Sequence, residues 1–238
     1  QLRMAEVESD SETLVLSEGG PAYYRQLFVD LSPRAFADAR LLRALQRLRG
    51  LRQAMQSPVK ERPWTEVARQ LADGEAGMFI MGDWAKGDFN AWGLSVDQQF
   101  GCAAVPGTAD YHLYSIDTLA MFADDYSHQP AQEVLAQIAM SPAVQSDYNK
   151  FKGAIPVWRS PDTSKMDSCS QNSWRVFSKG SAYLAPSLVH RMATDETTKD
   201  AIVAEVRRFF VDDQIGEAEA QRRLASIARA LSRTGKVE

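Results

Sequence analysis

The stretch that decides the interpretation of this chain is Gly74-Glu75-Ala76-Gly77-Met78-Phe79-Ile80-Met81-Gly82-Asp83-Trp84-Ala85-Lys86-Gly87. The pattern predicts a short apolar strand over Gly77–Met81, which Gly82-Asp83 interrupts. Trp84 then opens a new helix. Open sheets bind ligands beyond the carboxyl ends of their strands, so an indole ring flanked by Asp83 and Lys86 predicts a floor for a flat polar ligand. A tryptophan that only fills a strand–helix junction is the competing interpretation.

The composition is that of an ordinary globular protein. The chain has 238 residues, 45% of them hydrophobic, and a formal net charge of -4, so no overall basic field indicates a nucleic-acid partner. The sequence has no apolar run of the roughly 20 residues that a membrane span needs. Its first residues lack the apolar core of a signal peptide. We therefore expect either a cytoplasmic protein or one whose leader has been cut away.

The hydrophobic periodicity predicts a chain dominated by helices. Helices are expected over Pro21–Phe28, Pro33–Gln56, Pro63–Leu71, Pro130–Met140, Ser141–Phe151, Thr194–Val211 and Ala218–Leu231, and a short one from Pro186. Short strands are expected at Thr13–Leu16, Gly77–Met81, Phe100–Thr108 and Ile116–Phe122. The strands are too few and too far apart for regular βαβ repeats, which is unusual for a complete α/β domain.

The helix expected over residues 33–56 carries a stripe of arginines. They are Arg34, Arg40, Arg43, Arg47, Arg49 and Arg52. Such a stripe is typical of a solvated helix face, and the acidic total favours that interpretation over a phosphate-binding patch. A helical protein-interaction domain that uses this stripe stays open as an alternative function.

Catalytic and metal-binding motifs are absent from the sequence. It has no Gly-x-Ser-x-Gly, P-loop or His-Glu-x-x-His pattern, and its histidines, His112, His128 and His190, are scattered. Cys102 and Cys169 form no Cys-x-x-Cys pair, so one disulfide and two unrelated thiols are equally open. We therefore expect no enzyme and no cofactor or metal.

Four other side chains share a position at element ends or strand edges: Trp84, Asp117, Lys152 and His190. An aromatic face stacks on the apolar face of a sugar ring. A carboxylate accepts hydrogen bonds from hydroxyls, an ammonium donates them, and imidazole does either. Together they predict a site for a neutral polyhydroxylated ligand, although each residue alone also fits a cap, a helix end or an ordinary surface position.

The sequence resembles the glucose/mannose-binding branch of the periplasmic sugar-binding proteins of ABC transporters, in solute-binding family 1. The resemblance spans about residues 12 to 231. Its blocks are Ser17-Glu18-Gly19-Gly20, Tyr24, Arg62-Pro63-Trp64, residues 74–87, Pro106-Gly107-Thr108, Asp117 with Met121-Phe122, residues 145–157, Asp167 with Cys169, and His190-Arg191-Met192-Ala193. Each block is modest, but their order and spacing are specific.

The resemblance implies an α/β, helix-rich fold of the type II periplasmic binding-protein kind, with a C-terminal lobe, a crossover segment and an incomplete N-terminal lobe. Residues 1–105 and 141–238 would belong to the C-terminal lobe, and residues 106–140 to the crossover and N-lobe-type segment. It also implies that Trp84 stacks on sugar, that Asp117, Lys152 and His190 bind its hydroxyls, and that Cys102 and Cys169 form a disulfide. Trp158 stands where the family usually has arginine, which puts the detailed ligand preference in doubt.

The implied function is capture of a monosaccharide in the periplasm and its delivery to membrane permease subunits. The family is typically around 400 residues, so the resemblance implies that the first part of the N-terminal lobe and the signal sequence lie outside this sequence. We expect sugar binding by residues 1–238 to be weak or absent, and unpaired strand edges to allow a homodimer. A glycoside-processing module that uses Asp117 with a second carboxylate stays open as the enzymatic alternative.

Overall fold

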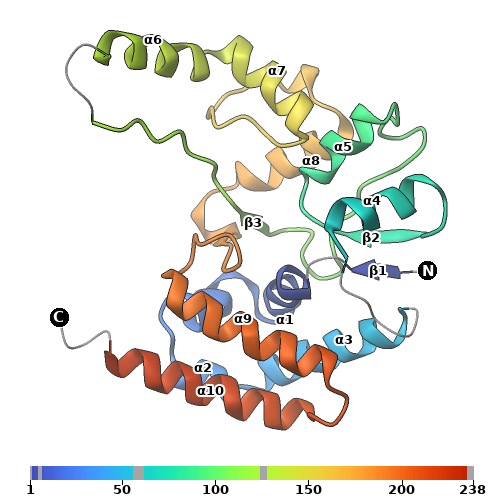
Figure 1. Ribbon diagram of the computed structural model, residues 1–238, viewed down its shortest axis with the longest axis vertical. Helices are drawn as coiled ribbons and strands as arrows, with labels where there is room; N and C mark the ends of the chain where they lie inside the picture. Colours follow the sequence, from blue (N-terminus) through green and yellow to red (C-terminus); the bar gives the residue numbers. More distant parts are fainter. Residues whose placement is uncertain (1, 5–6, 56–61, 124–127, 235–238) are drawn as a thin grey trace. The chain divides into compact units, whose positions relative to one another are not determined.

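The computed structural model describes residues 2–4, 7–55, 62–123 and 128–234 (Figure 1). Its backbone contacts divide the chain into two compact units. The first unit comprises Gln1–Met81, Ala104–Ser115 and Lys179–Glu238, and the second comprises Gly82–Ala103 and Ile116–Ser178. The boundary between Met81 and Gly82 therefore divides the 74–87 stretch. The assignment of chain segments to binding-protein lobes stays a prediction.

The first unit is built mainly from helices around one apolar core. Its helices are α1 (Val7–Phe28), α2 (Pro33–Phe36), α3 (Ala39–Gln53), α4 (Trp64–Ala72), α9 (Glu196–Val211) and α10 (Glu217–Thr234). Helix α1 packs on α3 and α9, and α10 packs on α9 and α2 (Figure 1). The largest side chains at the centre of the core include Tyr23, Tyr24, Phe36, Leu48, Phe209 and Phe210.

Two small parallel strand pairs complete the first unit. β1 (Leu2–Met4) pairs with β2 (Met78–Ile80), with Leu2 opposite Met78. β3 (His112–Tyr114) pairs with β4 (Leu184–Pro186), which follows a 3-10 turn at Ser181–Tyr183, and His112 lies opposite Leu184. The strand expected over Gly77–Met81 is confirmed in β2, and the chain is helix-rich with little sheet, as expected.

The second unit is a smaller group of helices. It contains α5 (Ala85–Ala91), α6 (Gln129–Ala139), α7 (Pro142–Lys152) and α8 (Ser168–Phe177), with a 3-10 turn at Thr163–Lys165. Ser141 caps α7 by accepting a hydrogen bond from the amide of Val144. Gly153 ends the helix in the left-handed conformation, with φ of 86°. The predicted helices over 130–140 and 141–151 are confirmed.

Several other predicted elements are wrong. Thr13–Leu16 lies inside α1, because Leu14, Val15 and Leu16 are all buried and a helix covered on several sides needs no polar alternation. The helix expected from residue 33 is divided, since Asp38 caps a new helix by accepting from the Arg40 amide; Gln56 lies outside the described residues. Residues 100–108 and 116–122 form no strand. Pro186 ends β4 instead of opening a helix.

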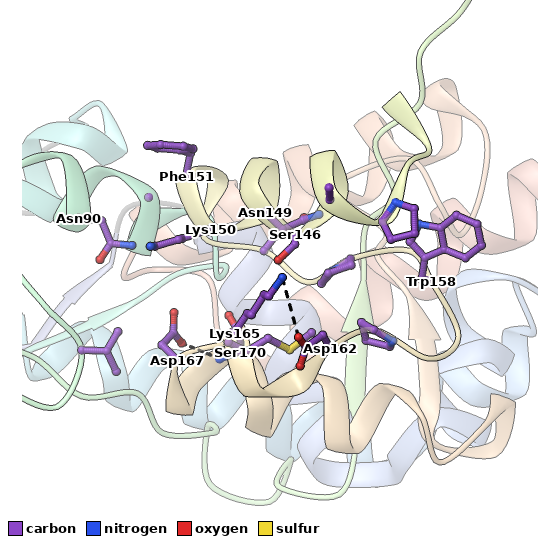
Figure 2. A pocket seen from close by; sticks show the side chains of 18 of the residues that line it. Asn90, Ser146, Asn149, Lys150, Phe151, Trp158, Asp162, Lys165, Asp167 and Ser170 are labelled. Carbon is purple, nitrogen blue, oxygen red and sulfur yellow. Dashed lines mark hydrogen bonds and ion pairs between the residues drawn. The ribbon is translucent and has the colours of Figure 1, made fainter. Parts of the chain in front are cut away.

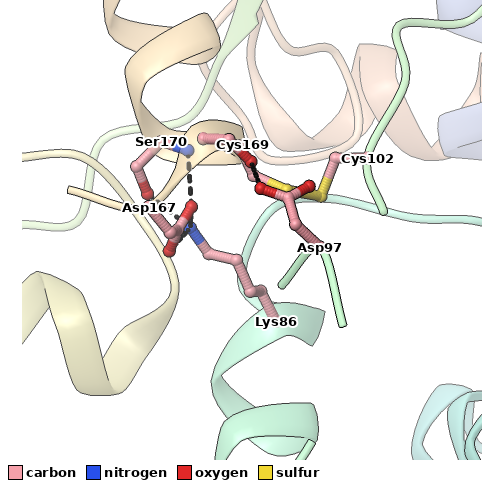
Figure 3. Close-up of a disulfide and its surroundings, with 7 residues drawn as sticks. Lys86, Asp97, Cys102, Asp167, Cys169 and Ser170 are labelled. Carbon is pink, nitrogen blue, oxygen red and sulfur yellow. Dashed lines mark hydrogen bonds and ion pairs between the residues drawn. A yellow bond between two sulfur atoms is a disulfide. The ribbon is translucent and has the colours of Figure 1, made fainter. Parts of the chain in front are cut away.

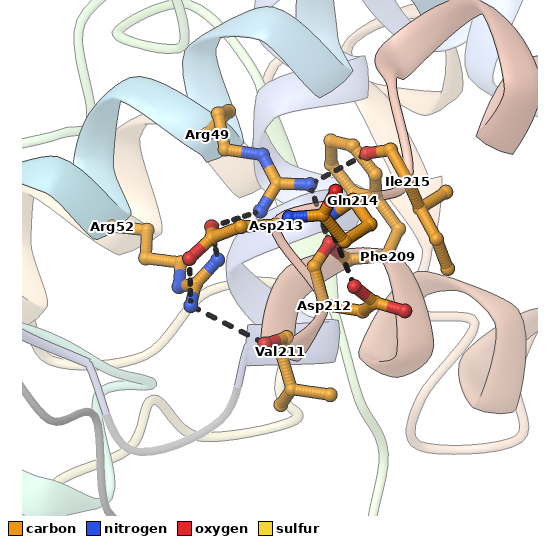
Figure 4. A network of polar contacts seen from close by, with 8 residues as sticks. All are labelled: Arg49, Arg52, Phe209, Val211, Asp212, Asp213, Gln214 and Ile215. Carbon is orange, nitrogen blue, oxygen red and sulfur yellow. Dashed lines mark hydrogen bonds and ion pairs between the residues drawn. The ribbon is translucent and has the colours of Figure 1, made fainter.

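The arginine stripe of α3 serves the core of the first unit. Arg49 donates to the backbone carbonyls of Phe209, Asp212 and Ile215 at 2.8–3.1 Å and lies over the Phe209 ring (Figure 4). Arg52 pairs with Asp213 and donates to the carbonyl of Val211. The Arg49 and Arg52 side chains are only 12% and 16% exposed. The expectation of a solvated face is therefore wrong for these two residues, because they satisfy the carbonyl end of α9.

Within the part of the chain that the structure describes, no helix is both long and apolar enough to span a bilayer.

Candidate functional site

Two glycines allow α5 and α7 to touch through their backbones in the second unit. A Cβ added to Gly87 would lie 2.7 Å from the carbonyl oxygen of Lys152. A Cβ added to Gly153 would lie 2.6 Å from the carbonyl oxygen of Asp83. Any side chain larger than hydrogen at either position would separate the segments. The two glycines therefore bring the backbone of Lys152 against the turn that carries Trp84.

Trp84 lies directly before α5 and is half-buried. Its indole ring covers Gly82, where an added Cβ would lie 2.1 Å from a ring carbon. Glycine at position 82 is thus what permits the ring to lie flat against the backbone. The ring is held by its own turn, which is the preorganisation that a stacking platform requires.

Lys152 and Asp117 are joined directly in the same unit. The Lys152 ammonium donates to a carboxylate oxygen of Asp117 and forms an ion pair with it. The Lys152 side chain is 28% exposed and that of Asp117 is 65% exposed. An exposed ion pair contributes at most about 1 kcal/mol, so its donor and acceptor remain available to a competing polar ligand. The structure thus brings together three of the four predicted sugar contacts in one unit.

Lys86 does not present its charge beside Trp84 as the sequence predicted. Lys86 is buried, and its ammonium donates to both carboxylate oxygens of Asp167 at 2.8–2.9 Å and to the hydroxyl of Ser170 (Figure 3). Burial raises the pKa of Asp83, against the opposing effect of Lys86 and Lys152. Lys86 is therefore a structural residue, because its buried ammonium is paired with the partly exposed carboxylate of Asp167.

Asp167 organises the end of α8 that receives Lys86. It caps the helix by accepting from the Ser170 amide at 2.8 Å. Burial acts to raise its pKa, but the hydrogen bonds from Lys86 and from the Ser170 amide outweigh burial and lower it. The carboxylate is thus held ionised against a buried cation.

The implied disulfide between Cys102 and Cys169 is present, with a Cα–Cα distance of 5.6 Å (Figure 3). It ties the segment after α5 to the first turn of α8. Ser168 strengthens the same junction by donating to Asp97 at 2.5 Å. Disulfides persist in oxidising compartments and are rare in reducing ones.

His190 lies in the first unit, after β4. Its Nδ1 is 2.8 Å from the Ser187 hydroxyl, which donates to Glu12 Oε1 at 2.7 Å. Glu12 is fully buried, and burial raises its pKa from 4.5 to about 7, against the hydrogen bonds that favour its ionised form. Burial also lowers the pKa of His190. Whether His190 shares a ligand with Trp84 stays a prediction.

The second unit also holds a cavity of about 930 Å³ among α5, α7, α8 and the loop between the last two (Figure 2). Its lining includes Asn90, Lys150, Trp158 and Lys165. None of Trp84, Asp117 and Lys152 lines it. The cavity and the predicted sugar contacts are therefore separate features of this unit. Among the described residues, no group of three or more His, Cys, Asp or Glu side chains could hold a metal ion.

No protein-family model matches the chain. It is 31% identical over 223 residues to a probable sugar-binding periplasmic protein of Brucella suis, covering 92% of this chain and 52% of that protein. It is 29% identical over 221 residues to a probable sugar-binding periplasmic protein of Rhizobium meliloti, covering 92% and 53%. It is also 31% identical over 133 residues to an uncharacterized ABC transporter extracellular-binding protein of Pyrococcus horikoshii, covering 56% and 30%.

The chain is thus similar over nearly its whole length to proteins named as probable sugar-binding periplasmic proteins. It spans about half the length of the curated relatives it matches. The relatives are named as binding proteins and not as enzymes.

Sequence reasoning missed Glu12 and Ser187, which hold His190. One signal was available: Glu12 directly precedes the apolar run Thr13–Leu16, and a carboxyl next to such a run predicts burial with a partner. Ser187 is 175 residues away and carried no local signal.

Proposed function

We propose that this chain is a solute-binding component of an ABC sugar transporter that binds a glucose- or mannose-like monosaccharide in the periplasm and presents it to permease subunits. The observation that carries the proposal is the grouping of Trp84, Lys152 and Asp117 around the Gly87–Gly153 contact. The names of the relatives and the disulfide support the sugar class and the periplasmic location.

The chemistry of the group suits neighbouring hydroxyls on a sugar ring. Each hydroxyl both donates and accepts a hydrogen bond. A Lys152 ammonium donor beside an Asp117 carboxylate acceptor offers complementary partners to two such hydroxyls. The Trp84 face adds stacking on the ring's C–H surface. Recognition of this kind breaks no bond, so the group requires no nucleophile or general base.

Saturation-transfer NMR on the full chain, with millimolar glucose, mannose and galactose, tests the proposal. We expect weak, saturable binding of at least one sugar. Trp84→Leu is expected to weaken it about tenfold, corresponding to about 1.4 kcal/mol. Asp117→Asn and Lys152→Met are expected to weaken it similarly.

Matched controls lie in the same unit. Trp158→Leu removes another partly exposed indole, and Lys165→Met removes another exposed lysine that pairs with an aspartate, Asp162. Both should leave binding unchanged. Binding that survives Trp84→Leu but not Trp158→Leu would place the ligand in the cavity and refute the proposed site. The absence of a response to every sugar would refute sugar binding by this chain.

A further inference from the structure

We propose that Glu12 is a positioning residue that sets, through Ser187, which ring nitrogen of His190 carries the proton and hence whether His190 accepts or donates a hydrogen bond toward a ligand. The inference rests on the proposed function only in its last step, where the ligand of His190 is a sugar hydroxyl. The hydrogen-bond chain itself lies entirely within the first unit.

The donors around Glu12 determine which group donates in the hydrogen bonds that join Glu12, Ser187 and His190. The Leu188 amide donates to Glu12 Oε2 at 2.6 Å, and the Tyr24 hydroxyl donates to the same oxygen. The other oxygen, Oε1, receives the Ser187 hydroxyl at 2.7 Å. The Val189 amide also donates a hydrogen bond to the carboxylate. An ionised carboxylate only accepts hydrogen bonds. The Ser187 proton must therefore point at Glu12 whenever Glu12 is ionised.

A hydroxyl has one proton, so this orientation determines the second contact of Ser187. Its oxygen lies 2.8 Å from His190 Nδ1 and also receives the His190 amide at 3.2 Å. With its proton committed to Glu12, the Ser187 oxygen must accept from Nδ1–H. The neutral ring is thereby held with a proton on Nδ1 and an acceptor lone pair on Nε2.

Protonation of Glu12 reverses every bond in the chain. The Leu188 amide and the Tyr24 hydroxyl both donate to Oε2, and Oε1 is the oxygen that faces the Ser187 hydroxyl, so the added proton lies on Oε1 and donates to Ser187. Ser187 then donates to His190 Nδ1, and the ring carries its proton on Nε2. In net terms one proton enters from solvent at Nε2, the Nδ1 proton passes to Ser187, and the Ser187 proton passes to Glu12. The raised pKa of Glu12, about 7, places this reversal within reach of physiological pH.

The groups around Glu12 do not offer a competing charge. Tyr24 lies on the same helix as Glu12, and burial raises the pKa of its hydroxyl well above the usual range, so Tyr24 stays a donor. Tyr114 on β3 also acts to raise the pKa of Tyr24. His190 follows β4. The helices that pack on α1 contribute charges that are paired elsewhere: Arg43 and Arg47 of α3 with Glu18, and Glu205 of α9 with Arg208.

Glutamine at position 12 gives the sharpest test. The two donors at Oε2 require the amide oxygen there, which turns the amide nitrogen toward Ser187. That nitrogen can only donate, so Glu12→Gln is expected to lock His190 in the Nε2–H form at every pH. Glu8→Gln, one helical turn earlier on α1, serves as the control, because it removes a carboxylate that takes no part in the hydrogen bonds between Glu12, Ser187 and His190.

The readout is nitrogen NMR of the full chain labelled with ¹⁵N-histidine, in which only three imidazoles appear and His190→Gln assigns one of them. For the wild type and for Glu8→Gln we expect Nδ1–H at about pH 8.5 and a change to Nε2–H as the pH falls through about 7. Wild-type protein with Nε2–H at pH 8.5, or Glu12→Gln with Nδ1–H, overturns the proposal. The wild-type titration decides the question even where a variant fails to fold.

Addition of the monosaccharide then separates the relay from the sugar site. A sugar that perturbs the His190 Nε2 signal supports the last step of the proposal. If the tautomer follows Glu12 while every sugar leaves that signal unchanged, the relay stands and the assignment of His190 as a sugar contact is refuted.

Discussion

Glu12→Gln is also expected to change how the stability of the first unit depends on pH. Burial raises the pKa of Glu12 from 4.5 to about 7. Over that interval the folded state binds more protons than the unfolded state, so the stabilisation is fully present below about pH 4.5 and is lost as the pH rises through about 7. A difference of about 2.5 pH units at about 1.4 kcal/mol each amounts to about 3 kcal/mol.

A histidine in the same unit opposes this effect. Burial lowers the pKa of His112 from 6.5 to about 4. Its contribution is therefore fully present above about pH 6.5 and is lost as the pH falls toward 4. Between about pH 5 and pH 8 the Glu12 and His112 contributions are each about 2 kcal/mol and of opposite sign. These two contributions should accordingly cancel to within about 1 kcal/mol over this range.

Removing either Glu12 or His112 leaves the pH dependence contributed by the other uncompensated. Glu12→Gln should lose about 2 kcal/mol of unfolding free energy on acidification from pH 8 to pH 5, whereas His112→Gln should gain about as much. Urea titrations followed by far-UV circular dichroism measure both. With Trp64, which lies in the first unit, replaced by phenylalanine, tryptophan fluorescence provides an internal control, because Trp84, Trp92, Trp158 and Trp174 all lie in the second unit. Parallel pH profiles for wild type and Glu12→Gln would refute the reasoning, since all other titrating groups are common to both proteins.

Three further substitutions test the structural interpretation. Replacing Cys102 and Cys169 by serine removes a cross-link between residues 67 positions apart. The loss of loop-closure entropy should lower the stability of the second unit by about 4 kcal/mol. If reductant left the unfolding midpoint of the wild type unchanged in tryptophan fluorescence, this prediction would be contradicted. Lys86→Met leaves the Asp167 carboxylate without its buried cation and should cost about 3 kcal/mol, against less than about 1 kcal/mol for the exposed Lys165→Met, both by urea unfolding. Arg49→Lys removes the planar guanidinium that donates to three carbonyls and should lower the stability of the first unit by about 2 kcal/mol in thermal unfolding. The Arg43 side chain is 51% exposed, so Arg43→Lys should change the stability by less than about 0.5 kcal/mol. Equal effects of the two substitutions would show that the carbonyl contacts of Arg49 are unimportant.

The helices with local start and stop signals could be predicted from the sequence. Ser141-Pro142 and Lys152-Gly153 bound α7, and Asp195 caps α9 by accepting from the Thr198 amide. The strand prediction for Thr13–Leu16 was wrong because four consecutive apolar or β-branched residues fit a buried helix as well as a strand. Its burial in α1 comes from packing against α3 and α9, which no local window contains.

The segment over 116–122 shows the same limit in the opposite direction. Its apolar composition predicts a strand, yet Leu119 and Phe122 are 70% and 83% exposed. A strand requires a hydrogen-bonding neighbour, and in the described part of the chain none lies beside this segment. Composition therefore indicates what a segment can form, and the presence of a partner decides whether it forms.

The roles of individual charged residues could not be predicted from the sequence, because the residues with which they pair lie far along the chain. Lys86 meets Asp167 across 81 residues, so its proximity to Trp84 in sequence wrongly suggested a ligand contact. The resemblance to sugar-binding proteins succeeded because it compared separated blocks together. The Gly82–Gly87 block and the Lys152-Gly153 block touch through Gly87 and Gly153. Two modest patterns were thus the two sides of one contact, and a glycine on each side is the physical requirement that links them.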